Sequence, residues 1–371
     1  MIQALKAGLL QTSFASYLPV MEPIILFPFT DLPVELAFMI LEYAARPTFD
    51  QADLYDARSP YSSALALCRV SKIVRRIVLP ELLHTILLPD FRHVEKFVHA
   101  LRMQKVYKEK GSDLHFEYAP RVHKMWIVSH GGNPASAHLP HAPRAHALKP
   151  SRSPLDISLL APILLAAPSL ALGWTSLDIL VECLEHVWKS HAATHVDNEH
   201  PPLPWKTQTL TLSCTPPTTG PQWERLTDTP QGSTFLGSIS HLSANPYVCD
   251  YKSHTADLDR DYRLPLWMGI TPWAIFKSLQ TVFLSYPRIA SSVDPFALIF
   301  TGIDSYVELL TLSASLLRDH CDCIPKEIKG FAKIGPGEEC IQSDDVRLKV
   351  SDSRICWYTR DGWEKVWACM L

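Results

Sequence analysis

Short segments in which apolar residues alternate with other residues recur along this chain, mostly from about residue 120 onward. Alternation with a period of two predicts β-strands, and helical stretches precede several of these segments, so we expect an α+β or α/β repeat architecture. The intervals are irregular, roughly 27–43 residues, which indicates a degenerate helix–strand solenoid. The expected strands are residues 84–88, 122–128, 169–174, 208–213, 238–243, 279–285 and 306–313, and two of the expected helices are residues 156–167 and 272–278.

Proline limits the length of these elements. The chain has thirty prolines against fourteen glycines, and a proline ring cannot donate the hydrogen bond that continues a helix or a central strand. Two Pro-rich stretches, about 131–154 and 198–221, are therefore expected to be surface loop insertions. Residues 1–29 are expected to be an N-terminal extension. They make a poor targeting signal, and Glu22 together with three prolines excludes a membrane-spanning helix, so we expect no membrane partner.

Composition and charge exclude further partners. With 47% hydrophobic and 20% charged residues the chain is typical of globular proteins. Its net charge of -3 offers no basic field, and its aromatic residues are not interleaved with lysine or arginine, so we expect no nucleic-acid partner. Nine cysteines, an odd number at irregular spacing, do not predict a disulfide framework. This cysteine usage fits a reducing compartment and predicts a cytoplasmic or nuclear protein.

The spacing of apolar residues over 32–45 predicts an amphipathic helix, which precedes the expected strands in the sequence. The apolar residues on one face, at positions i, i+3, i+4 and i+7, are Leu36, Met39, Ile40 and Tyr43. Pro33 suits the first helical turn, where its missing amide hydrogen costs nothing. Such a helix either packs on residues 90–130 as part of an ordinary N-terminal subdomain or docks on another protein.

A second helix is expected over residues 62–79, with Pro80 ending or kinking it. Its apolar stripe consists of Leu67, Val70, Val74 and Ile77. After the strand at 84–88, Asp90 is placed to cap a further helix that starts at Phe91. The stripe of that helix consists of Val94, Phe97, Val98 and Leu101. Near the end of the sequence we expect a strand followed by a helix capped by Asp361.

No enzyme motif is present. The sequence lacks G-x-S-x-G, P-loop, H-E-x-x-H and C-x-x-C patterns. His186, His191 and His195 lie close enough in sequence to suggest a metal site, but no acidic or cysteine ligand completes a known spacing. A solvated helix end explains these histidines better. We therefore expect no catalytic residue, no metal and no cofactor.

The two N-terminal helices resemble the F-box motif, in which a Leu-Pro-x-Glu-Leu start and an apolar ladder precede a helix around Val-Ser-Lys. The matching residues are Leu32, Pro33, Glu35, Leu36, Ile40, Leu41, Val70, Ser71 and Lys72. Residues 30–88 would then be an F-box-like helical domain. Residues 89–371 are similar to the divergent leucine-rich-repeat tails of fungal F-box-like proteins. Val74, where the family often has an aromatic residue, and the long 46–61 loop depart from the pattern.

The resemblance implies a substrate-recruiting adaptor of an SCF-type (cullin–RING) ubiquitin ligase. The matching residues would bind an Skp-family adaptor, and the repeat body would bind an unknown protein substrate. A segment of about fifty residues is also too small to bury its apolar faces alone, so it must pack on the body of the chain, on a partner, or on both. Two alternatives stay open: a repeat scaffold that binds other proteins without a ligase, and a metal-dependent enzyme built on the histidines.

Overall fold

The computed structural model describes residues 32–47, 60–127, 155–173, 176–194, 202–213, 223–245, 268, 271–288, 306–319, 339–343, 345–350 and 367. The chain divides into two units, Met1–Ile40 and Leu41–Leu371. Helix α1 (Val34–Ala45) crosses the boundary between them. The described part of the larger unit is a mixed α/β structure that contains one open sheet, so the expected α/β class is confirmed at this level.

The helix expected over residues 62–79 is instead two helices, α3 (Ser62–Leu67) and α4 (Lys72–His84). Ser71 separates them because its backbone is extended and its side-chain oxygen accepts a hydrogen bond from the Val74 N–H at 3.1 Å. This N-cap starts a new helix rather than continuing the old one. Pro80 was expected to end or kink this helix, but it does not end it, because α4 runs on to His84. Burial of Val78, Leu79 and Leu83 on one face offsets the hydrogen bond that the proline removes.

The elements that follow α4 agree with the sequence. Strand β1 (Thr85–Leu88) leads into helix α5 (Phe91–Glu109), and the Asp90 carboxylate accepts a hydrogen bond from the His93 N–H at 3.0 Å. The predicted stripe faces inward, with Val94, Val98 and Leu101 buried and Phe97 partly buried. The 3-10 helix η2 (Ala119–Arg121) then precedes the next strand.

Within the described residues, nine strands form one sheet, and each strand expected from sequence is present in it. The order of the first six follows the order of the chain, and all their pairings are parallel. After β1 these are β2 (Lys124–Ile127), β3 (Ser169–Gly173), β4 (Thr209–Ser213), β5 (His241–Asn245) and β6 (Thr281–Arg288). Strand β4 therefore lies within the 198–221 stretch, whose Pro-rich flanks alone remain candidates for loops.

The last three strands depart from this parallel pattern. Strand β7 (Tyr306–Ser313) pairs antiparallel with β6, and β9 (Val346–Val350) and β8 (Glu339–Ser343) continue antiparallel to the edge. The strand expected near the end of the sequence is β9. The helix expected after Asp361 lies outside the described residues, apart from Trp367.

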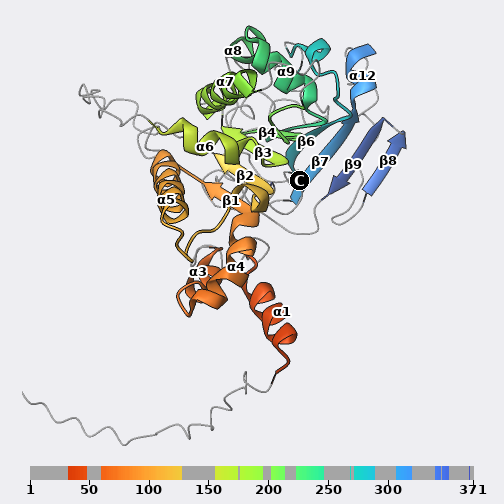
Figure 1. The fold of residues 1–371 in the computed structure, drawn as a ribbon. Helices are drawn as coiled ribbons and strands as arrows, with labels where there is room; N and C mark the ends of the chain where they lie inside the picture. The colour runs from red at the N-terminus through yellow and green to blue at the C-terminus, as the bar shows by residue number, and fades with distance from the viewer. Residues whose placement is uncertain are drawn as a thin grey trace, which may run out of the picture. The chain divides into compact units, whose positions relative to one another are not determined.

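Helices cover one face of this sheet (Figure 1). They are α5, α6 (Ile157–Leu164), α7 (Leu177–Thr194), α8 (Glu224–Thr227), α9 (Pro230–Ser238) and α12 (Ala314–Asp319). The helix expected over 272–278 is only a 3-10 turn, η6 (Trp273–Ile275), because Pro272 and Phe276 at its two ends have non-helical backbone angles.

The register aligns apolar residues across the sheet. Leu170, Leu210, Leu242 and Val282 are successive partners on β3, β4, β5 and β6, and all are fully buried in the main core. Their neighbours along each strand point to the opposite face, because side chains alternate along a strand. The helix-facing side thus holds one continuous apolar core.

The Tyr61 hydroxyl forms hydrogen bonds with two backbone groups on the edge of β1 that does not pair with β2. The Tyr61 hydroxyl donates to the Thr85 carbonyl at 2.7 Å and accepts from the Leu87 N–H at 3.0 Å. These two backbone groups face away from β2, in the positions where a further strand would bond. Tyr61 therefore blocks strand addition at this edge.

Replacing this hydroxyl should destabilise the protein. In Tyr61→Phe both backbone groups lose their partner, and we expect the free energy of unfolding to fall by about 1–3 kcal/mol. Urea unfolding measures the change, and hydrogen exchange at the Leu87 amide should accelerate. Tyr43→Phe is the matched control: Tyr43 is 75% exposed, so a change beyond roughly 0.5 kcal/mol is not expected there. Equal effects of the two substitutions would contradict the role of Tyr61.

Candidate functional site

Exposed apolar side chains gather in one part of the sequence. Of the twelve large apolar residues that the described structure exposes, nine lie between residues 34 and 73. These nine are Val34, Leu36, Phe38, Met39, Ile40, Tyr43, Leu65, Val70 and Ile73. Isolated exposed apolar residues are normal on protein surfaces, whereas a contiguous exposed apolar patch is a candidate interaction site.

Helix α1 carries most of this exposure. The four residues of its predicted stripe are exposed by 46% at Leu36, 62% at Met39, 42% at Ile40 and 75% at Tyr43. Val34 and Phe38, which lie off that stripe, are exposed as well. Helix α1 thus exposes apolar side chains on more than one of its sides.

The C-terminal end of α1 is anchored differently. Ala45 is fully buried with Ala64 of α3 and Val78 of α4, and Leu41 and Val74 pack against this small cluster. Leu41, which the F-box resemblance placed among the adaptor-binding residues, is thus half-buried inside its own chain. Val74, the departure from the family pattern, fills a position in the same cluster.

The remaining N-terminal residues of the predicted set lie at the start of α1. Leu32 is half-buried, while Pro33 and Glu35 are exposed. The Pro33 carbonyl accepts the Ala37 N–H at 3.1 Å and so begins the helix. Glu35 lies in the first turn, where its charge favours the positive end of the helix.

The Val-Ser-Lys residues divide between surface and structure. Val70 is 68% exposed in the turn between α3 and α4. Ser71 caps α4, and the Lys72 ammonium forms an ion pair with the Asp113 carboxylate at 2.8 Å. Ser71 and Lys72 therefore have roles within their own chain, whatever else they contact.

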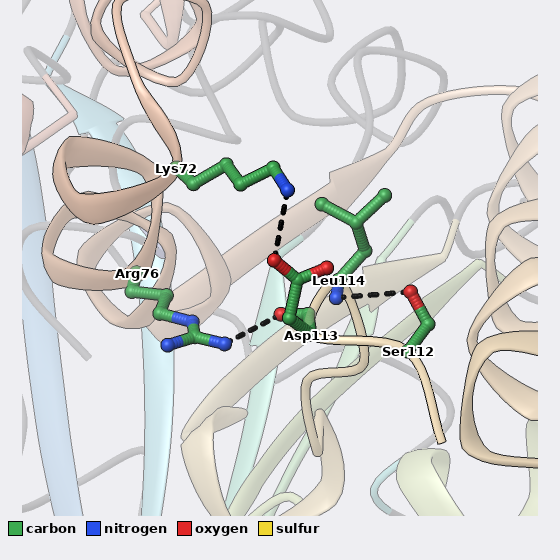
Figure 2. A network of polar contacts seen from close by, with 5 residues as sticks. All are labelled: Lys72, Arg76, Ser112, Asp113 and Leu114. Atoms are coloured by element: carbon green, nitrogen blue, oxygen red, sulfur yellow. Dashed lines mark hydrogen bonds and ion pairs between the residues drawn. The ribbon is translucent and has the colours of Figure 1, made fainter. Parts of the chain in front are cut away.

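Figure 2 shows the contact of α4 with the turn that follows α5. Arg76 donates to the Asp113 carbonyl at 2.6 Å, and the Leu114 N–H donates to the Ser112 hydroxyl at 3.2 Å. The hydrogen bond from Lys72, followed by its charge, lowers the pKa of Asp113. This network fixes the start of α4 to the body of the larger unit.

His84, the last residue of α4, lies near another histidine and two cationic side chains. The rings of His84 and His123 stack at a centroid distance of 4.7 Å. Burial lowers the pKa of His84, and the nearby charges of His123, Lys124 and Arg46 lower it further. The folded protein therefore favours the neutral ring.

The described residues supply few groups for other chemistry. Burial raises the pKa of the Cys68 thiol and raises that of Cys183 to about 12, which disfavours the nucleophilic thiolate at neutral pH. His186 and His191 lie on α7, and His195 lies outside the described residues. Among the side chains that the structure describes, no group of three could hold a metal ion.

Sequence reasoning missed Val34, Phe38, Leu65 and Ile73 as exposed residues. For Val34 and Phe38 the signal was available, since apolar residues in α1 extend beyond one stripe. Leu65 and Ile73 were assigned to one continuous helix, and that assignment gave no reason to expect them to be exposed. The N-cap at Ser71, which reorients the residues on either side, was the signal that could have revealed the break.

Comparisons with family models, with curated proteins and with solved structures found no match. Among the described helices, none has the length and apolar character needed to cross a membrane.

Ser71 can be tested as a structural residue. Ser71→Ala removes the acceptor for the Val74 N–H, and we expect the free energy of unfolding to fall by about 1 kcal/mol. Ser71→Asp should restore most of it, because aspartate is also a preferred N-cap. Chemical denaturation of the three proteins measures this. An alanine variant as stable as the wild type would show that the cap contributes nothing.

His84 predicts a dependence of stability on pH. Its folded pKa lies below its ordinary value, so the unfolded chain binds more protons as the pH falls through about 6.5. The free energy of unfolding should therefore decrease below that pH and level off below the folded pKa. His84→Gln should make the curve flatter between about pH 7.5 and 5.5. Parallel curves for variant and wild type would exclude His84 as the cause.

Proposed function

We propose that residues 30–88 form an F-box-like unit that binds an Skp-family adaptor, and that the chain recruits a protein substrate to a cullin–RING ubiquitin ligase. The observation that carries this proposal is the exposed apolar stripe of α1. Leu36 and Ile40, which the F-box resemblance assigned to adaptor binding, are both among its exposed members. Under this proposal the protein acts in the cytoplasm or nucleus.

The energetics of such an interface favour α1 as its centre. Stable protein–protein interfaces bury about 1,200–2,000 Å², and a few well-packed residues supply most of the affinity. Leu36, Met39 and Ile40 already present apolar side chains that a partner helix can cover. Val70 and Ile73 are exposed apolar residues of the larger unit, and the proposal does not depend on them.

For the body, we propose an irregular repeat architecture of the leucine-rich type. Its support is the order of strands β1 to β6, in which each strand pairs in parallel with the next one in the chain. Repeat proteins stack in this sequential way, and their terminal units are atypical. Antiparallel strands β7, β9 and β8 would be such a terminal cap. In this role the chain breaks no bond, and its contribution to ubiquitin transfer is proximity.

The contacts of Ser71 and Lys72 favour a second candidate, a repeat scaffold that binds proteins without a ligase. Ser71 caps α4 and Lys72 pairs with Asp113, so both residues already have contacts within the chain. Val74 packs in the small apolar cluster at the position where the family often has an aromatic residue. This candidate predicts no detectable affinity for an Skp-family adaptor.

Adaptor binding is tested by co-expression and pull-down with purified Skp-family adaptor, followed by titration. We expect Leu36→Asp and Ile40→Asp each to weaken binding by about 30-fold or more, because a buried charge would replace an apolar anchor. Asp at position 36 lies in the first turn of α1, where negative charge is favourable, so the helix should persist.

Leu203→Asp is the matched control. Leu203 is 47% exposed against 46% for Leu36, yet it lies in the body of the chain. We expect the control to bind like the wild type. Unchanged binding by both α1 variants, or no binding by the wild type, would overturn the adaptor proposal, and the second result would favour the scaffold.

A further inference from the structure

One face of α4 and the turn that follows α5 together line a small pocket at the surface of the larger unit. The turn contributes residues 113–116. The pocket is accessible from solvent, since the side chains of Lys72 and Asp113 at its rim are exposed by 69% and 54%. The α4 residues of the lining share one side of the helix, at positions i, i+3, i+4 and i+7, and are Lys72, Arg75, Arg76 and Leu79.

The lining of this pocket carries more positive than negative charge. It contains three cations, Lys72, Arg75 and Arg76, and one carboxylate, that of Asp113. Lys72 pairs with the Asp113 carboxylate at 2.8 Å, and Arg76 donates to the Asp113 carbonyl at 2.6 Å (Figure 2). Asp113 therefore neutralises one of the cations and holds two of them in place.

Arg75 has no such counterpart. The residue is half-buried, and its guanidinium forms no hydrogen bond and no ion pair with any residue that the structure describes. Its charge acts on the Cys68 thiol and the Tyr118 phenol, but burial raises the pKa of both groups, so both are uncharged at neutral pH. Charges removed from water usually have a partner, and a guanidinium has five N–H donors to satisfy. Arg75 is thus available to an anion that enters the pocket.

His115 presents a second available side chain from the turn. Its backbone N–H donates to the Ser112 carbonyl at 3.0 Å, which fixes the residue, while its ring has no hydrogen-bond partner within the described part of the chain. Leu79, Leu114 and Phe116 complete the lining with apolar surface. Apolar surface beside cations strengthens their attraction for an anion, because it lowers the local dielectric constant.

We propose that this pocket binds a single phosphate group, with Arg75 and His115 as its ligands and with Lys72 and Arg76 supplying further positive charge. A guanidinium offers two parallel N–H donors to an oxyanion, and the imidazole adds a donor from the other element. Donors that approach from two elements suit a tetrahedral oxyanion better than a planar carboxylate. The inference does not depend on adaptor binding by the N-terminal helices.

The size of the pocket limits what it can hold. The enclosed space is little larger than one water molecule. A phosphate group can place part of its oxygens inside and leave the rest in solvent, whereas a nucleotide base or a sugar ring cannot enter. The pocket therefore recognises the phosphate group itself and not the molecule that carries it.

NMR of histidine rings in the full-length protein tests the site directly. Inorganic phosphate is titrated at constant pH and ionic strength, with chloride as the ion replaced. We expect a saturable shift of the His115 ring resonance with a dissociation constant of about 1 mM, and His115→Gln identifies that resonance by its loss. His93 is the internal control, because it lies about 24 Å along α5 from Glu109. A shift that does not saturate, or equal shifts of the two rings, would overturn the proposal.

Arg75→Gln should weaken phosphate binding by about tenfold or more, because it removes both the charge and the paired donors. Arg69→Gln is the matched control. Arg69 is exposed in the turn between α3 and α4, and its loss changes the net charge equally, but it does not line the pocket. We expect the control to change the affinity by less than about twofold. Equal weakening in the two variants would show that only the general charge of this region matters.

If circular dichroism shows that Arg75→Gln is unfolded, Arg75→Lys replaces it. Lysine keeps the charge but lacks the planar pair of donors, so phosphate binding should still weaken by about threefold or more. An affinity equal to that of the wild type would count against Arg75 as a ligand.

Asp113→Asn separates the electrostatic role of the pocket from a structural one. Asparagine keeps the backbone carbonyl that binds Arg76 and a side-chain oxygen that can accept from Lys72, but it removes the negative charge. Phosphate binding should therefore become tighter by about threefold. A purely structural role predicts no gain, and weaker binding would contradict the assignment.

Other anions define the chemistry that the pocket selects. Acetate, which is planar, should bind about fivefold more weakly than phosphate or worse, and equal affinity would overturn the assignment to a phosphate group. Glycerol 2-phosphate then identifies the source of the group. Binding as tight as that of inorganic phosphate supports a phosphate monoester as the natural ligand, and binding of inorganic phosphate alone supports the free ion.

Discussion

The stacking of apolar side chains from one parallel strand to the next is the interaction on which the rest of the structure depends. Each of the strands β1 to β5 has only four or five residues, too few to bury a face by itself. In register, Leu170, Leu210, Leu242 and Val282 form one continuous row beneath the helices. Because this row needs only the strands to align, the segments between them can vary in length.

The same pleat gives the sheet two faces of different chemistry. Leu210 and Leu212 point into the helix-side core, while Thr211 between them points to the opposite face. That opposite face carries small polar residues and the contact between Trp126 and Trp367, whose ring centroids lie 5.4 Å apart.

The N-terminal helices contain two groups of residues, one that makes contacts within the chain and one that is exposed. Ala45 and Val74 hold the helices together, and Ser71 and Lys72 begin α4 and fix it to the turn after α5. Leu36, Met39 and Ile40 take no part in these contacts and remain exposed. The motif residues are thus not equivalent: some make the helices, and others are available to a partner.

The sequence by itself determined where most elements lie, because alternation, helical periodicity and the Asp90 cap act over a few residues. It also determined that α1 carries an apolar stripe. Only the tertiary structure decided that this stripe is exposed, that α4 continues through Pro80, and that β7 turns antiparallel to β6. Those outcomes depend on which distant surfaces meet: burial of Leu79 and Leu83 offsets a missing hydrogen bond. Likewise, no local pattern connects Trp126 with Trp367, since their contact exists only once the sheet has formed.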